Sequence, residues 1–304
     1  MKKKQVIIFN DTPGVRLDVF LSGVTEFSRT RIQNMISSGK VSVNGISTRA
    51  QYRLRSGDNI QVEEPEKKTS DIIPEDIPLE FIYEDDDFAV INKKRGMVVH
   101  PATSHNSGTV VNAILYHFKE NISPGSSPER PGIIHRIDKG TSGILIVTKT
   151  EKMQNAMSSI FMNRQIEKRY LAIVKGIPSS ENGRIELPIK RDRKHRKKMT
   201  VSENGKNAIT LFKTIENLKG YTYLSVNILT GRTHQIRVHF SYLGNPILND
   251  TLYGYNGREF ELDGFALHAS SIAFKHPYTG EKMYFEAPLP DDFSKTLDLL
   301  RSES

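Results

Sequence analysis

Residues 133–147 read IIHRIDKGTSGILIV, and this stretch decides how the rest of the chain is interpreted. A polar segment, residues 135–143, lies between the apolar pair Ile133-Ile134 and the apolar run Ile144–Val147. Apolar flanks of this kind predict buried strands, which would hold Asp138 at the edge of a core in a fixed geometry, as a functional carboxylate requires. Taken alone, the segment also fits an ordinary charged loop between two strands. It is not a phosphate-binding loop, because the upstream glycine spacing is missing.

The chain around this stretch, residues 79–300, is rich in strand-like runs separated by turns. The runs are Leu79–Tyr83, Phe88–Ile91, Ile144–Val147, Tyr170–Val174, Tyr221–Leu229 and Ile272–Phe274. Helical spacing is rarer: one helix is predicted from Met153, Met157, Ile160 and Phe161, and another from Ile236, Phe240 and Leu243 after a Thr233 cap. Because strands seldom alternate with helices, the predicted fold class is α+β, with a large mixed, mainly antiparallel sheet.

The first part of the chain predicts a separate, small α+β domain over residues 12–66. Its helix would start at Ser28, bury Ile32, Met35 and Ile36 on one face and end at Gly39. Val41 and Val43 alternate before the turn pair Asn44-Gly45, which indicates short strands joined tightly. From Glu63 to Pro78 large apolar residues are few, so we expect a linker at residues 67–78, followed by the large domain at residues 79–300.

Composition limits the chemistry and the partners. Lysine and arginine number 43 against 35 acidic residues in 304, a net charge of +8, which favours a polyanionic partner. The absence of cysteine excludes disulfides, thiolate zinc sites and iron–sulfur clusters, while carboxylate chemistry stays open. The histidines lack metal-binding spacing, so no metal is expected. No apolar run reaches the roughly 20 residues that span a bilayer, and Val6–Phe9 is too short for a signal peptide, so we expect a cytoplasmic protein without a membrane partner.

The segment His135-Arg136-Ile137-Asp138, followed after two residues by Thr141-Ser142-Gly143, resembles the hallmark of the RluA and RluD-like family of RNA pseudouridine synthases. In this hallmark His-Arg-Leu-Asp precedes two variable residues and Thr-Ser-Gly, so only Ile137 differs. The resemblance continues in order through Asn92-Lys93 with 96–101, then 168–172, 231–239, 267–269 and 276–277. It departs at Lys94, where the family commonly has proline, and at Gly140, where an acidic residue is frequent.

The resemblance implies a role for each matching residue. Asp138 would be the nucleophile or covalent catalyst, because a carboxylate can trap the sugar or the base while a glycosidic bond is broken and remade; which of the two it attacks is left open. Arg237 would pair with Asp138, keep it ionised and fix its rotamer, although a structural ion pair or a phosphate contact is the alternative. Tyr170 would stack on the flipped base and could accept the proton from carbon 5. Leu267 would line the pocket. Tyr170 and Leu267 could also be ordinary core residues.

Several basic residues are candidates for RNA contact. Arg136 would position the displaced strand beside the catalytic loop, or form a surface salt bridge. Residues 190–198 hold seven lysines and arginines in nine, which predicts an arm that contacts phosphates through Arg193, Lys194, Arg196 and Lys197, although such runs are usually solvated loops. Residues 16–58 resemble an S-four type RNA-binding domain, which implies phosphate contacts for Arg29, Arg31 and Lys40.

These observations predict a pseudouridine synthase, an isomerase that needs no cofactor and modifies uridines in structured RNA. Ribosomal RNA of the large subunit is favoured and transfer RNA is possible; a monomer is the default. One alternative is a non-catalytic RNA-binding ribosome assembly factor. Another is a hydrolase built on Ser37 and Lys40, which satisfy Ser-x-x-Lys but lie in the small domain.

Overall fold

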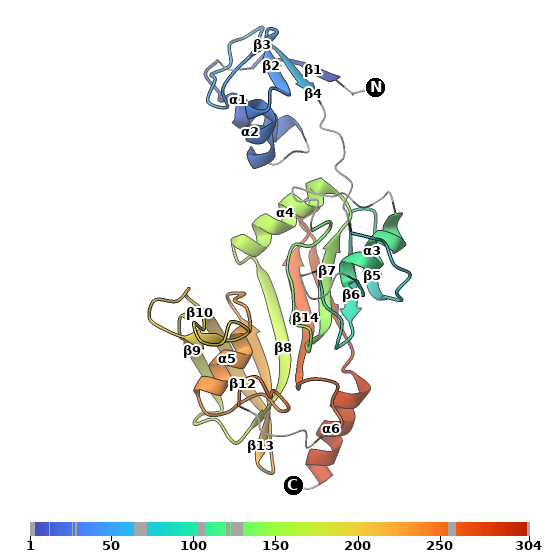
Figure 1. The fold of residues 1–304 in the computed structure, drawn as a ribbon, viewed down its shortest axis with the longest axis vertical. Helices are drawn as coiled ribbons and strands as arrows, with labels where there is room; N and C mark the ends of the chain where they lie inside the picture. The colour runs from blue at the N-terminus through green and yellow to red at the C-terminus, as the bar shows by residue number, and fades with distance from the viewer. Residues whose placement is uncertain are drawn as a thin grey trace.

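A computed structural model describes residues 4–11, 13–25, 27, 29–63, 72–101, 107–119, 122, 130–254 and 260–302 (Figure 1). The predicted fold class is confirmed: a large, mostly antiparallel sheet with helices follows a small α+β unit at the N-terminus. Ser28, the predicted helix start, lies outside the described residues. No helix in the described ranges is long and apolar enough to cross a membrane.

The N-terminal unit is a four-stranded sheet packed against two helices. Its strand order is β1-β4-β2-β3, from β1 (Lys4–Ile8), β4 (Asn59–Glu63), β2 (Val41–Val43) and β3 (Ile46–Ser47). Helices α1 (Leu17–Val24) and α2 (Arg29–Ser37) bury Leu17, Leu21, Ile32, Met35 and Ile36 in a core of their own. Asn44 and Gly45 both have positive φ, 53° and 79°, as the predicted tight turn between β2 and β3 requires.

The large sheet contains nine of the described strands, in the order β5-β6-β7-β14-β8-β13-β12-β9, with β15 paired to β14. All of its pairs are antiparallel except β7 with β14. Its strands are β5 (Glu80–Glu84), β6 (Phe88–Lys93), β7 (Ser142–Thr148), β8 (Ile166–Lys175), β9 (Asn182–Glu186), β12 (Ile209–Leu218), β13 (Tyr221–Ile228), β14 (Leu267–Lys275) and β15 (Lys282–Glu286). A separate hairpin joins β10 (Ile189–Arg191) to β11 (Met199–Val201).

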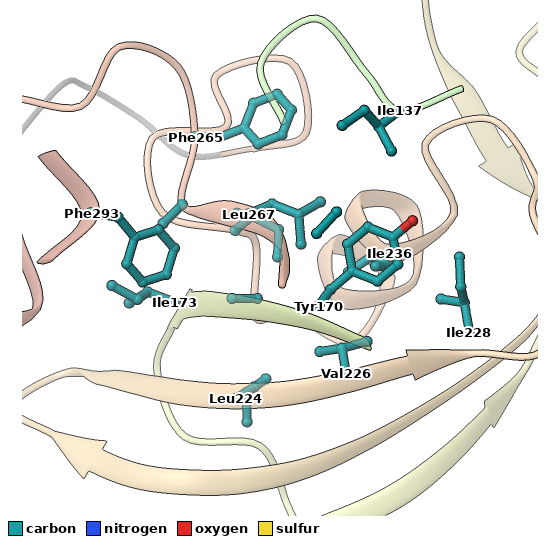
Figure 2. Close-up of a cluster of buried hydrophobic side chains, with 14 of the residues drawn as sticks. Ile137, Tyr170, Ile173, Leu224, Val226, Ile228, Ile236, Phe265, Leu267 and Phe293 are labelled. Carbon is teal, nitrogen blue, oxygen red and sulfur yellow. The ribbon is translucent and has the colours of Figure 1, made fainter. Parts of the chain in front are cut away.

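Strand β7 is buried over its whole length, because both faces of the sheet are covered around it. Ile144 and Ile146 belong to a core shared with α4 (Glu151–Met162), whereas Leu145 and Val147 belong to the larger core on the other face. Helices α3 (Val110–Phe118), α5 (Gln235–Tyr242) and α6 (Asp291–Ser302) contribute to that larger core, part of which is shown in Figure 2. The loop that precedes β7 is therefore attached to a rigid, fully packed strand.

The parallel pair β7–β14 explains the glycine of the Thr-Ser-Gly motif. Gly143 has φ 105°, and a Cβ built there would lie 2.2 Å from the carbonyl oxygen of Ala269. A side chain at this position would thus push the two backbones apart. Glycine lets β14, which begins with Leu267, approach the start of β7 closely.

Some expectations for individual elements are wrong. Ile133-Ile134 do not form a strand; Ile133 makes a single bridge to Val147. Helix α5 is capped by His234, with φ 57°, and not by Thr233. Helices α3 and α6 and strands β9 to β12 and β15 were not expected. Within the stretch predicted as a linker, Ile73 accepts a hydrogen bond from the side chain of Asn112 on α3 (2.8 Å).

Candidate active site

The loop that carries Asp138 is held against the edge of β7. The backbone N–H of Thr141 donates to the carbonyl of Asp138 (3.0 Å), which closes a turn. Nε2 of His135 accepts the backbone N–H of Ile146 (2.9 Å), on the edge of β7 beyond its short pairing with β14. Burial lowers the pKa of His135 to about 3, so the imidazole stays neutral and keeps its acceptor nitrogen. The histidine of the motif therefore anchors the loop, and the aspartate lies three residues further on.

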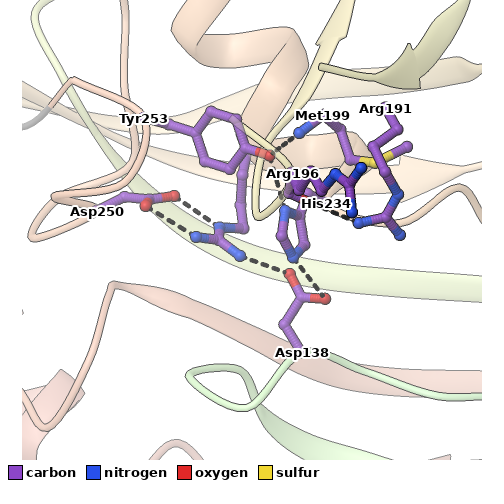
Figure 3. Close-up of polar contacts among 8 residues, drawn as sticks. Asp138, Arg191, Arg196, Met199, His234, Asp250 and Tyr253 are labelled. Carbon is purple, nitrogen blue, oxygen red and sulfur yellow. Dashed lines mark hydrogen bonds and ion pairs between the residues drawn. The ribbon is translucent and has the colours of Figure 1, made fainter. Parts of the chain in front are cut away.

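Arg237 bridges two carboxylates (Figure 3). Its Nη1 donates to Oδ2 of Asp138 (2.9 Å), while its Nε and Nη2 donate to Oδ2 and Oδ1 of Asp250 (2.7 and 2.9 Å). Phe265 and Tyr253 place their rings 4.2 and 4.9 Å from the guanidinium carbon. Burial opposes the charge of Arg237, but the two carboxylates outweigh it and raise its pKa. The fixed guanidinium leaves Oδ1 of Asp138 without a direct hydrogen bond from Arg237.

The position of Arg237 depends on how α5 is attached to β12. At the start of the helix, Gln235 donates to the carbonyl of Ile209 and to the hydroxyl of Thr210 (both 3.0 Å). One turn later, Nδ1 of His239 lies 2.9 Å from the same hydroxyl. The Gln and the second His of the motif thus fix the helix, and Arg237, between them, projects toward Asp138.

His234 approaches the other oxygen of Asp138. Its Nε2 lies 3.8 Å from Oδ1 of Asp138, and its Nδ1 lies 2.7 Å from the hydroxyl of Tyr253. Burial lowers the pKa of His234, although the charge of Asp138 opposes this, and the net direction keeps the ring neutral near pH 7.

The buried side chain of Lys93 supports the loop that carries Asp138. The side chain of Lys93 is fully buried, and its Nζ donates to the carbonyls of Lys94 (2.8 Å), Met97 (3.0 Å) and Lys139 (3.4 Å). Burial lowers its pKa to about 7, and the charge of Asp138 limits the shift. A lysine whose pKa is lowered by burial therefore lies against the Asp138 loop.

Asp138, His234 and Arg237 line a cavity of about 200 Å³. Its lining brings together the predicted residues Asp138, Tyr170, Arg237 and Leu267 from four separate parts of the chain. The ring of Tyr170 lies beside Ile236 and Leu267, as Figure 2 shows. Within the described part of the chain, its hydroxyl has no hydrogen-bond partner that the structure records, although buried tyrosines usually have one. Burial raises the pKa of Tyr170, so the hydroxyl is neutral. A small cavity lined by Asp138, Arg237 and the hydroxyl of Tyr170 can hold a flat, polar ring.

Comparison with known proteins agrees with this geometry. The family model for RNA pseudouridylate synthases matches residues 87–242, which include Asp138, Tyr170 and Arg237, and the S4 domain model matches residues 15–60. The chain belongs to the RNA pseudouridine synthase family. As a member of that family it is an isomerase, and it carries an S4 RNA-binding domain.

Sequence similarity to known relatives covers almost the whole chain. The chain is 42% identical to the RNA pseudouridine synthase YlyB of Bacillus subtilis, over 94% of each chain. It is 38% identical to the ribosomal large subunit pseudouridine synthase D of Zymomonas mobilis, over 99% of this chain and 98% of that one. A human structure, RNA Pseudouridylate Synthase Domain Containing 4, has the same fold, with a TM-score of 0.57 and 24% identity over 73% of this chain and 93% of that chain.

Of the predicted RNA-contacting residues of the large domain, two line cavities beside Asp138 and three lie in the β10–β11 turn. Arg136 is exposed and lines the cavity around Asp138, and with Lys197 it also lines an adjoining cavity of about 750 Å³ that includes Asp138. Arg193, Lys194 and Arg196 are exposed in the turn of the β10–β11 hairpin. Asp192 accepts the backbone N–H groups of Lys194 and His195 (2.7 and 2.9 Å), so the turn is ordered.

The three predicted residues of the S4 domain differ in their surroundings. Nε of Arg29 donates to buried Asp18 (3.0 Å), so its position is fixed while half of its side chain is exposed. Arg31 is paired with Glu151 at the start of α4. Lys40 is half-buried before β2.

Sequence reasoning assigned no role to His234, Tyr253, Asp250 or Lys93. His234 and Lys93 lay in the matching segments, but nothing in the spacing indicated their contacts. Asp250 and Tyr253 follow α5 in an irregular segment without a recognisable pattern. No group of described residues has the arrangement of a metal site.

Proposed function

We propose that this synthase converts uridine to pseudouridine in folded RNA with Asp138 as its catalytic carboxylate. The arrangement of Asp138 carries the proposal: the carboxylate is fixed through one oxygen by Arg237, at the floor of a cavity that also presents Tyr170. A cavity of about 200 Å³ accommodates a single flipped base, and its mouth carries the exposed cation of Arg136.

The reaction breaks the bond from C1′ to N1 of uridine and forms one from C1′ to C5. The hydrogen on C5 leaves as a proton and N1 gains a proton, so atoms and electrons balance without a cofactor. Oδ1 of Asp138 is the oxygen that attacks the sugar or the base, because Oδ2 is bound by Arg237. Asp250 holds the guanidinium in place, so that Asp138 keeps one rotamer during the rotation of the base.

Tyr170 is proposed as the surface on which the flipped base stacks. Its ring is packed beside Leu267 and its hydroxyl faces the cavity. The raised pKa makes a resting phenolate scarce near neutral pH, so a proton from C5 reaches Tyr170 only if the hydroxyl gives up its own proton in the same step. Stacking needs no such step, and Tyr170→Phe separates the two roles because it keeps the ring.

Large-subunit ribosomal RNA is the proposed substrate, with transfer RNA as the second possibility. The support is the 38% identity over nearly the full chain to a protein named for the ribosomal large subunit, together with the S4 domain and the net charge of +8. We propose two domains with limits of 12–66 and 79–300 and a linker at 67–78. The two separate hydrophobic cores support the division, while β1 and the buried Phe9 extend the first unit to the N-terminal side of residue 12. A cytoplasmic monomer is part of the same proposal.

Mapping pseudouridines in ribosomal and transfer RNA from cells that lack the protein tests this proposal. We expect one or more sites in large-subunit RNA to revert to uridine and to be restored by the wild-type chain but not by Asp138→Asn. An unchanged map would contradict the proposal, and a loss confined to transfer RNA would correct the substrate. The Ser-x-x-Lys hydrolase gains no support, because the Ser37 hydroxyl donates to the carbonyl of Asn34 (2.9 Å) at the end of α2.

A further inference from the structure

Two hydrogen bonds and one longer electrostatic contact connect the basic β10–β11 hairpin with Asp138. The backbone N–H of Met199, the first residue of β11, donates to the hydroxyl oxygen of Tyr253 (2.8 Å). That hydroxyl lies 2.7 Å from Nδ1 of His234, whose Nε2 faces Oδ1 of Asp138 at 3.8 Å (Figure 3). The three side chains and the hairpin backbone come from four separate segments, so only the folded site brings them together.

The contacts on the two sides of the His234 ring determine which of its nitrogens carries the proton. The Tyr253 oxygen accepts from Met199, and its hydroxyl hydrogen can donate to Nδ1 of His234, its recorded acceptor among the described residues. The Asp138 carboxylate, which faces Nε2, favours a proton on that nitrogen. Burial raises the pKa of Tyr253 to about 12, which keeps that hydrogen in place. Neutral His234 therefore carries its proton on Nε2, and this N–H faces Asp138. The opposite tautomer would turn a lone pair toward a carboxylate oxygen.

Apolar packing fixes the hairpin to the same segments. A small core contains Ile189 of β10, Val238 of α5 and the ring of Tyr253, with Met199 and Leu252 packed against it. Movement of the hairpin would break the Met199–Tyr253 bond before it disturbed the large sheet. The turn of this hairpin carries the basic residues proposed to contact RNA, so a displacement of the turn by bound RNA would act first on the Met199–Tyr253 bond.

We propose that Tyr253 and His234 are positioning residues through which the placement of the β10–β11 hairpin orients Asp138. The Nε2–H of His234 orients Oδ1 electrostatically but, at 3.8 Å, does not occupy it, so the oxygen stays open to the substrate. Arg237 holds Oδ2 and His234 orients Oδ1. The inference rests on the proposed catalytic role of Asp138 and adds to it a link between RNA contact and the state of the carboxylate.

Four charged groups act on His234 besides the hydroxyl of Tyr253. Asp138 and Asp250 favour the protonated ring, whereas Arg237 and Arg136 disfavour it, and burial lowers its pKa overall. A protonated His234 needs Tyr253 to turn its hydrogen away from Nδ1, toward an acceptor that the described residues do not provide. The Tyr253 hydroxyl therefore protects the neutral form, and without it the pKa of His234 rises. The resulting imidazolium would pair with Oδ1 and withdraw it from the reaction.

Tyr253→Phe tests the proposal, because it removes the hydroxyl and keeps the ring against Arg237 and His234. We expect kcat to fall about tenfold, the value of one net hydrogen bond, with KM for the RNA unchanged, and the acid limb of kcat to move to higher pH. Tyr242→Phe, an exposed tyrosine of α5, is the matched control and leaves both unchanged. An unchanged kcat and acid limb in Tyr253→Phe would overturn the proposal.

A second pair of variants covers the case in which Tyr253→Phe folds poorly, as thermal unfolding would reveal. The side chain of His234→Gln can place an N–H donor where Nε2 lies, whereas His234→Ala has no such donor. Both variants keep the same left-handed backbone at residue 234, so backbone strain does not distinguish them. We expect the Gln variant to retain several-fold more kcat than the Ala variant. Equal activities would contradict an orienting N–H.

The link to the hairpin is tested by combining variants. Replacing Arg193 and Lys194 by serine should raise KM and lower kcat in the wild-type chain, but only raise KM in the Tyr253→Phe chain. Additive effects on kcat would overturn the coupling. Asp138→Asn distinguishes failure of the proposed function from failure of this inference. If Asp138→Asn stays active, the proposed function fails. If Asp138→Asn is inactive and Tyr253→Phe is unaffected, only the positioning role of Tyr253 and His234 fails.

Discussion

Three donor atoms of Arg237 are divided between two carboxylates, and this division defines the site at the residue scale. Asp250, 1% exposed, takes two of them, and Asp138, 18% exposed, takes the third. One cation thus holds a structural carboxylate and the proposed catalytic carboxylate together. A planar guanidinium can do this because its donors point in fixed directions, whereas an ammonium is a single point charge.

Arg237→Lys therefore should not preserve the site, although it preserves the charge. We expect kcat to fall at least about 100-fold and the free energy of unfolding to fall by about 3 kcal/mol, because one buried carboxylate loses its partner. Tritium release from RNA labelled at C5 of uridine and urea unfolding measure the two effects. Arg184→Lys, in an exposed pair with Glu186, is the control and should change neither. A fully active Arg237→Lys would refute the bridging role.

The sequence predicted part of this site. The motif and its resemblance identified Asp138, Tyr170, Arg237 and Leu267, and the structure brings all four to one cavity; their catalytic roles stay predictions. Asp250 and the Tyr253–His234 contact were not predicted, because each depends on a partner placed by the fold and not by spacing along the chain. A lone aspartate in an irregular segment carries no local signal of the arginine 13 residues away.

At the scale of elements, the close contact of β7 with β14 joins the Asp138 loop to the strand that carries Leu267. Apolar runs predicted β7, and the spacing of Met153 and Met157 predicted α4, because burial on one face leaves a periodic pattern. Helix α3 was missed because its β-branched start, Val110-Val111, resembles a strand, and its capping box uses Asn112 where Glu or Gln is usual.

Gly143→Ala should disrupt the close contact of these strands. Its Cβ would lie 2.2 Å from a backbone oxygen, at a φ of 105° that L residues rarely adopt. We expect a loss of about 3–5 kcal/mol of unfolding free energy, from overpacking and backbone strain together, and a fall in kcat as the loop shifts. Gly220→Ala is the matched control, because Gly220 has φ 73° and open space where a Cβ would lie. We expect it to lose only about 1 kcal/mol of unfolding free energy, from backbone strain alone. Equal losses in the two variants would contradict the packing argument.

At the scale of the whole molecule, several buried or half-buried histidines make stability depend on pH. Burial lowers the pKa of His135 to about 3 and that of His268 to about 4, while His234 and His239 shift in the same direction. The unfolded chain binds these protons near pH 6.5 and the folded chain does not. Stability is therefore fully present above pH 6.5 and falls as the pH decreases.

We expect the free energy of unfolding to fall between pH 6.5 and 5 by up to about 1.4 kcal/mol per pH unit for each such histidine. Urea unfolding across this range measures the slope. His135→Asn should reduce the slope by about one proton, whereas His195→Gln, at the exposed hairpin turn, should leave it unchanged. A slope that His135→Asn does not alter would contradict the neutral state of this ring in the folded protein.

Asp138→Asn measures the central claim most directly, because the amide keeps the size of the side chain and removes its nucleophilic charge. Ribosomal RNA tritiated at C5 of uridine, taken from cells that lack the protein, is incubated with the wild type, with Asp138→Asn and with the exposed-site control Glu203→Gln. The wild type and the control should release tritium at the same rate. Asp138→Asn should release none while it binds the RNA within about threefold of the wild type, since one carboxylate adds little to a polyelectrolyte contact. Tritium release by Asp138→Asn at a rate comparable to the wild type would show that another group carries the reaction.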